Sequence, residues 1–119
     1  MHSVGVDIVE ISRIQTALAR WGERFLLRVY TPAEIALSHG RAPQLAVRFA
    51  GKEAVSKALG TGLKGVSWRE IEILAEKSGK PYVRLCGRAK ARAQELGLTS
   101  FAISLSHTDD LGVAFVVAL

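Results

Sequence analysis

Two acidic residues stand in surroundings that disfavour a charge. Asp7 lies among Val and Ile in a stretch typical of a strand, although aspartate is a poor strand former. Glu53 lies in a helical stretch and shares one face, at intervals of four residues, with Phe49 and Lys57. A carboxylate beside apolar neighbours needs a cation or hydrogen-bond donors to offset its lost hydration. Because two carboxylates with water and phosphate oxygens are usual ligands of Mg²⁺, Asp7 and Glu53 are candidate metal ligands.

Each acid also has a purely structural explanation, and spacing alone does not show that the two residues meet. Asp7 could form a salt bridge or lie on an edge strand. Glu53 could pair with Lys57 on a solvated helix face, an interaction worth only about 0.3–0.5 kcal/mol. The sequence has no Cys/His cluster, which argues against zinc.

A glycine-rich loop follows the same helix. Gly60, Thr61 and Gly62 supply flexible backbone amides and a hydroxyl between Lys57 and Lys64, and such a loop can bind an anion. The loop follows a helix instead of preceding one, so it does not match a P-loop. A simple helix cap explains Gly60 equally well.

His107 ends a stretch in which Phe101, Ile103 and Leu105 alternate with small residues. If the alternation continues, His107 is half-buried and hydrogen-bonded. It could also contact a phosphate group or transfer a proton.

Three arginines are spaced to lie along one helix. Arg13, Arg20 and Arg24 would form a stripe on a continuous helix, although Gly22 weakens that alignment. The stripe is either a solvated face or a docking surface for an acidic helix of another protein.

The elements that carry these residues can be predicted from periodicity and composition. Strands are predicted at residues 4–11, 67–75, 81–85, 99–107 and 112–119. Helices are predicted from residue 11 to the Gly22 break, and at residues 23–30, 44–59 and 87–96, with a further helix starting at the capping sequence 31–34. Strands separated by a block of helices predict an α+β fold, with a largely antiparallel sheet and the long helix packed on it.

The 119 residues are enough for one domain, residues 1–119, because half that length rarely folds alone. Apolar residues make up 49%, yet no run approaches the roughly 20 residues of a spanning helix, so no membrane association is expected. The first residues lack the basic leader of a signal peptide. The single cysteine, Cys86, fits a reducing cytoplasm.

The net charge of +5 favours anionic partners without choosing among them. Aromatic residues are only 7%, and no basic cluster contains Phe or Tyr as a base-stacking surface does. These two observations argue against nucleic acid as the partner.

Three segments together resemble the holo-[acyl-carrier-protein] synthases, small single-domain members of the phosphopantetheinyl transferase superfamily. Residues 5–10 are similar to the opening strand of that family, residues 48–62 to its signature helix and loop, and residues 104–108 to its late strand. The central segment is the specific one, and the order and spacing extend the resemblance over the whole chain. Gly51 is a mild departure, because alanine is commoner there.

The resemblance implies transfer of the 4′-phosphopantetheine arm of coenzyme A to a serine of apo-acyl carrier protein, in support of fatty acid biosynthesis. It implies Mg²⁺ held by Asp7 and Glu53, with Glu53, directly or through a metal-bound water, helping to deprotonate the serine. The implied catalytic residues are Glu53, Lys57 and His107. The implied coenzyme A contacts are Arg48, Lys57, Gly60, Thr61, Gly62, Lys64 and His107.

The resemblance also implies partners. Arg13, Arg20 and Arg24 would face the acidic recognition helix of the carrier protein. Family members form homotrimers with active sites at subunit interfaces, and the Val-rich terminal strands offer apolar surface for such contacts. The alternative is a non-catalytic basic α+β module that binds RNA or an acidic protein, which the unusual positions of Asp7 and Glu53 fit poorly.

Overall fold

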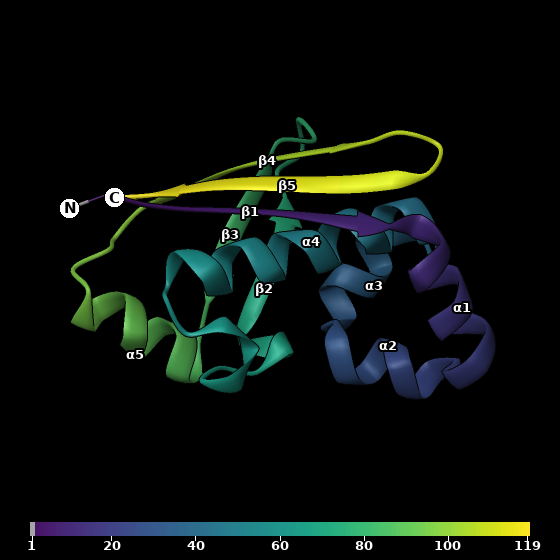
Figure 1. Ribbon diagram of the computed structural model, residues 1–119, viewed down its shortest axis with the longest axis horizontal. Coiled ribbons are helices and arrows are strands. Elements are labelled where there is room, and N and C mark those ends of the chain that lie inside the picture. Colours follow the sequence, from purple (N-terminus) through teal and green to yellow (C-terminus); the bar gives the residue numbers. More distant parts are fainter. Residues whose placement is uncertain (1) are drawn as a thin grey trace.

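The computed structural model, which describes residues 2–119, places one strand first, a block of helices next, and the other strands later in the chain (Figure 1). The elements are β1 (Ser3–Glu10), α1 (Ile11–Trp21), α2 (Glu23–Val29), α3 (Pro32–Ser38), α4 (Ala42–Ala58), the 3₁₀ turns η1 (Gly62–Lys64) and η2 (Trp68–Glu70), β2 (Ile71–Ala75), β3 (Pro81–Leu85), α5 (Gly87–Glu95), β4 (Phe101–His107) and β5 (Leu111–Ala118).

The strands pair antiparallel, as predicted, but in two sheets and not one. The order β1-β5-β4 puts the last strand in the middle of the larger sheet, with Ala118 opposite both Ser3 and Phe101. This pairing brings the two ends of the described chain side by side (Figure 1). The hairpin β2–β3 forms the second sheet, and β3 lies against β4. The predicted α+β class is confirmed.

The long helix α4 packs against the larger sheet and is buried on nearly every side. Gly5 of β1 lies so close to α4 that a Cβ there would overlap the carbonyl oxygen of Ala54. Gly51 of α4 has Ile73 3.0 Å from the position a Cβ would take. Gly5 therefore allows the close approach of strand and helix that brings β1 side chains next to α4, and Gly51 allows the close approach of β2 to the same helix.

Helix starts and breaks follow the local signals. Thr31 and Glu34 form the predicted capping box, with the Thr31 amide donating to Glu34 at 3.0 Å. Gly22, at φ +53°, separates α1 from α2. Helix α4 starts at Ala42, two residues before its predicted start, because Pro43 is accepted in a first turn.

The strand predicted over residues 67–75 was wrong in its first half. Ser67 and Glu70 form a second capping box, so the chain makes the turn η2 before β2 begins at Ile71. Other element ends differ from prediction by one or two residues, as is usual where end turns fray.

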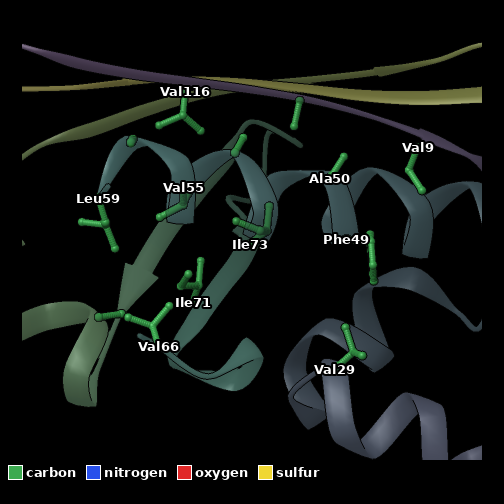
Figure 2. Packing of buried hydrophobic residues seen from close by; sticks show 14 of the residues in the cluster. Val9, Val29, Phe49, Ala50, Val55, Leu59, Val66, Ile71, Ile73 and Val116 are labelled. Carbon is green, nitrogen blue, oxygen red and sulfur yellow. The ribbon is translucent and has the colours of Figure 1, made fainter. Parts of the chain in front are cut away.

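The core lies between α4, the inner face of the larger sheet and β2 (Figure 2). The side chains of Val9 and Val116 point from the sheet toward α4, while those of Ile71 and Ile73 pack against the same helix from β2. The outer face of the larger sheet is also apolar but exposed; its large side chains are Val4, Val6, Ile8, Leu111 and Phe115. Among the described residues, no helix is long and apolar enough to cross a membrane.

Candidate active site

Strand β1 and helix α4 bring Asp7 next to Lys57 at the free edge of the larger sheet. The Asp7 side chain is on the α4 side of β1, the side that carries the buried residues Gly5 and Val9. Lys57 Nζ donates to Asp7 Oδ1 at 3.1 Å and to the carbonyl of Val6 at 3.0 Å. The salt bridge and the edge-strand position offered as structural explanations for Asp7 are therefore both present.

Glu53 lies one helical turn before Lys57 and faces the same edge. It is half-buried, and its pKa is raised above the usual range, first by burial and then by the negative charge of Asp7. The positive charges of Lys57 and Arg13 oppose that rise. Asp7 is thus close enough to Glu53 to raise the pKa of the Glu53 carboxyl, while the ion pair of Lys57 is made with Asp7.

The donor set at this edge suits a hard divalent cation. Within residues 2–119, no group of three or more His, Cys, Asp or Glu side chains could hold a metal ion. The carboxylates at this edge are those of Asp7 and Glu53. Mg²⁺ is usually bound by one or two carboxylates together with substrate phosphates and water. The arrangement fits that mode and not a zinc site.

The loop after α4 caps the helix. The Gly60 amide donates to the Lys57 carbonyl at 3.0 Å and the Thr61 amide to the Ser56 carbonyl at 3.2 Å, which is a Schellman motif. Both amides are therefore engaged by the helix. The Thr61 hydroxyl is buried and has no hydrogen-bond partner in the described part of the chain, and Lys64 is exposed in η1. In this loop the Thr61 hydroxyl, unlike these two amides, makes no hydrogen bond within residues 2–119.

An open pocket lies on the other side of α4, between α4, the β2–β3 hairpin and β4. Its lining includes Arg48, Lys80 and His107. His107 is exposed, so its predicted half-burial was wrong: it ends β4, an edge strand of the larger sheet, and its Nδ1 lies 3.2 Å from the carbonyl of the adjacent Thr108.

Arg48 is 5% exposed and serves the fold. Its Nε donates to the Ile73 carbonyl at 3.2 Å, and its Nη1 donates to both the carbonyl and the side chain of Gln44. Burial lowers its pKa, with the charge of Glu34 opposing. Arg48 thus ties α4 to β2 at the edge of the pocket, and its predicted contact with coenzyme A stays a prediction.

One chain does not bring all the predicted site residues together. Asp7 belongs to β1 and His107 to β4, which lie on opposite sides of β5. We call Asp7, Glu53 and Lys57 the acid cluster. The acid cluster and the His107 pocket therefore face opposite edges of the sheet.

The predicted arginine stripe is grouped around an aromatic ring. The guanidinium groups of Arg20 and Arg24 lie 5.0 and 6.0 Å from the ring centre of Trp21. Arg13 lies instead over Phe49, at 5.9 Å. Trp21 continues the apolar spacing of α1 but is 49% exposed, which that spacing did not predict. The available signal for an exposed Trp21 was its position at the end of a predicted helix, directly after Arg20 and three residues before Arg24.

Sequence reasoning also missed a buried ion pair beside the site. Lys52, next to Glu53, is fully buried and donates to Glu34 Oε1 at 2.6 Å and to the carbonyls of Trp68 and Ile71. Burial lowers the pKa of Lys52, and Glu34 opposes this. A lysine in an Ala-rich helix does not reveal its burial, because the partner acid is 18 residues away.

Residues 3–116 match the family described as the 4′-phosphopantetheinyl transferase superfamily. The chain belongs to this superfamily.

Within it, the similar proteins are holo-[acyl-carrier-protein] synthases. That of Herpetosiphon aurantiacus is 50% identical over 126 residues, covering 100% of this chain and 99% of that protein. That of Dehalococcoides mccartyi (strain ATCC BAA-2266 / KCTC 15142 / 195) is 52% identical over 118 residues, covering 99% and 98%. The crystal structure of the Helicobacter pylori synthase in complex with coenzyme A is 34% identical, has a TM-score of 0.89, and covers 98% of this chain and 99% of that one. The chain is thus one of the holo-[acyl-carrier-protein] synthases, the group that its central segment resembles.

Proposed function

We propose that this chain transfers the 4′-phosphopantetheine group of coenzyme A to a serine hydroxyl of apo-acyl carrier protein and releases adenosine 3′,5′-bisphosphate. The observation that carries this proposal is the convergence of Asp7, Glu53 and Lys57 on one sheet edge. The similar proteins named above carry the same activity in their names, and the Helicobacter relative binds coenzyme A.

The acid cluster supplies the groups that the reaction needs. The serine oxygen forms a bond to the phosphorus that carries pantetheine, the bond to the bridging oxygen breaks, and the bridging oxygen leaves with the nucleotide. Glu53, whose pKa is raised by burial and by Asp7, is the candidate acceptor of the serine proton, directly or through water. Lys57, half exposed at the same edge, offsets negative charge on the phosphate oxygens. The chain thus mainly positions groups and balances charge, as phosphoryl transfer requires.

Asp7 and Glu53 would hold a Mg²⁺ ion. When bound, the ion supplies positive charge to the diphosphate and lowers the pKa of bound water. Asp7 is paired with Lys57 in the structure, so Lys57 Nζ lies beside one of the carboxylates that would hold the ion.

The active site is proposed to form between copies of the chain in a homotrimer. The acid cluster and the His107 pocket lie on opposite edges of one sheet. One copy would therefore supply Asp7 and Glu53, and a neighbouring copy would supply His107 and Arg48. The exposed apolar outer face of the sheet offers the contact surface, with Phe115 48% exposed and Ile8 62% exposed. An uncovered face of this kind marks an interaction site.

Helix α1 and the start of α2 are proposed to dock the carrier protein. Arg13, Arg20 and Arg24 are exposed, and Trp21 supplies an apolar centre among the charges. An acidic helix would satisfy this surface. Action in the cytoplasm, in support of fatty acid biosynthesis, completes the proposal.

The deciding experiment incubates the chain with apo-acyl carrier protein, coenzyme A and Mg²⁺ and measures the intact mass of the carrier. A gain of one phosphopantetheine supports the proposal, and EDTA should abolish it. An unchanged carrier mass, with a folded enzyme and a carrier that a known synthase modifies, would refute the proposed function.

A further inference from the structure

Lys52 is a charged residue of the core to which the proposed function gives no role. It lies on α4 directly before Glu53, and its side chain is fully buried. Its ammonium group has three hydrogens and three acceptors: Glu34 Oε1 at 2.6 Å, the carbonyl of Trp68 at 3.0 Å and the carbonyl of Ile71 at 2.6 Å. One nitrogen atom therefore ties α4 to α3, to η2 and to β2.

Glu34, the partner of Lys52, is bound just as fully. Its Oε1 also accepts a hydrogen bond from the Thr31 amide at 3.0 Å, and its Oε2 accepts one from the Ile73 amide at 2.9 Å. Arg48, one turn before Lys52, donates to the carbonyl of Ile73 at 3.2 Å. Side chains of α3 and α4 thus bind backbone groups of β2, and the Lys52–Glu34 pair is the centre of this contact.

The anchoring of Lys52 fixes the direction in which Glu53 points. Neighbouring residues of an α-helix point about 100° apart, so the helix cannot turn about its axis without moving both side chains. Lys52 faces α3 and β2, whereas Glu53 faces the edge of β1 that carries Asp7. Trp68 contacts the same helix at a second point, because its ring packs on Phe49 with the ring centres 4.7 Å apart. The rotation that aims Glu53 at Asp7 is therefore set from another side of α4.

An ion pair is not the choice that would make this core most stable. Burial removes the hydration of both charges, and replacement of such a pair by apolar side chains is often neutral or stabilising. Hydrogen bonds depend on angle, whereas the hydrophobic effect has no direction. The Lys52–Glu34 pair therefore supplies a fixed orientation at the position next to Glu53.

We infer that Lys52, bound to Glu34, is a positioning residue for the transfer reaction: it fixes the rotation of α4 and so keeps Glu53 aimed at Asp7. The inference rests on the proposed function, in which Glu53 is the candidate base and a candidate metal ligand. Lys52 is buried away from both substrates and acts only through the helix. Because a misplacement of about 1 Å can cost about 10²-fold in rate, its loss should appear in kcat.

The test removes both charges together, because a single substitution would leave the other ion buried without a partner. The double variant carries Lys52→Met and Glu34→Gln, which keep side chains of similar size. Val29→Ala, which removes two carbon atoms from the buried end of α2, is the control for a loss of stability alone. For each variant we would measure kcat, the KM of coenzyme A, the KM of the carrier protein and, by thermal unfolding, Tm.

We expect the double variant to be folded, with kcat lowered about tenfold or more and both KM values within about threefold of the wild type. Val29→Ala should lower Tm and change kcat less than about twofold. The inference would be overturned by a folded double variant with wild-type kcat, by a loss confined to KM, or by an equal fall of kcat in Val29→Ala.

If the double variant is not folded, Glu34→Asp is tested in the same way. This substitution keeps both charges but draws the carboxylate back by one methylene group, so the 2.6 Å contact with Lys52 is lost. It should lower kcat about fivefold or more and leave both KM values within about threefold of the wild type. Wild-type kcat in Glu34→Asp would contradict the inference.

The result is separable from the proposed function. Failure of the wild-type enzyme to modify the carrier protein contradicts the function itself. Normal transfer by the wild type, combined with unchanged kcat in the folded variant, contradicts only the role given to Lys52.

Discussion

Lys57 and Asp7 are 50 residues apart in the chain, and their charged groups lie 3.1 Å apart at the free edge of β1. The same lysine nitrogen donates to the carbonyl of Val6. This contact joins the signature helix to the first strand at the place where Glu53 also faces Asp7. The chemistry proposed for the protein depends on that meeting of helix and strand.

The first prediction concerns the two acids. Glu53→Gln and Asp7→Ala should each lower Mg²⁺-dependent transfer by about 10²–10⁴-fold, because each removes a candidate metal ligand and Glu53 is also the candidate base. Activity is measured as holo-carrier protein formed per minute, and folding by circular dichroism. The control is Glu10→Gln, which removes an exposed acid from the same strand. Full activity in either acid variant would refute the metal assignment.

The second prediction concerns the arginines of α1. Reversal of Arg13 and Arg20 to Glu should raise the KM for the carrier protein about tenfold or more and leave the Kd of coenzyme A nearly unchanged, because only the carrier would be repelled. The matched control reverses two exposed lysines, Lys77 and Lys90, and so changes the net charge equally. Equal losses toward both substrates, or equal losses in the control, would count against docking on α1.

The third prediction tests whether the site is shared between copies. Glu53→Gln and His107→Ala should each be impaired, and a mixture unfolded and refolded together should regain activity. In mixed trimers an intact Glu53 of one copy meets an intact His107 of its neighbour. Holo-carrier protein formation is compared before and after mixing, with each variant refolded alone as the control. A mixture no more active than the sum of its parts would place both residues in one copy or show that His107 is not needed.

The fourth prediction concerns stability and pH. Partial burial works to raise the pKa of Glu70, but hydrogen bonds from the Ser67 and Arg88 amides outweigh it and hold that pKa below its usual range. Because the folded pKa is lowered, the stabilisation is present above the unfolded value of about 4.3 and is lost as pH falls through the folded value.

Glu70→Gln should therefore reduce the free energy of unfolding by about 1 kcal/mol at neutral pH, comparable to the loss of a helix cap, and by much less in acid. Urea unfolding at the two pH values measures the difference. Exposed Glu76→Gln serves as the control. A loss of equal size in acid and at neutral pH would show that the charge of Glu70 is not responsible.

Local patterns predicted much of the fold and of the site. The strand around Asp7, the helix carrying Glu53 and Lys57, the break at Gly22 and the capping box of Thr31 all depend on nearest neighbours, and the structure has each of them. The exceptions have local or tertiary causes. Residues 67–70 form a capped turn because Ser67 and Glu70 bond each other.

The sequence by itself determined which residues carry charge, in which stretches most helices and strands lie, and that acids occupy apolar surroundings, because these properties depend on residue type and short-range spacing. Only the tertiary structure decided that Lys57 pairs with Asp7, that Lys52 is buried on Glu34, and that His107 lies across the sheet from the acids. These relationships depend on the order of strands in the sheet and the packing of α4, which bring together residues that no local pattern connects.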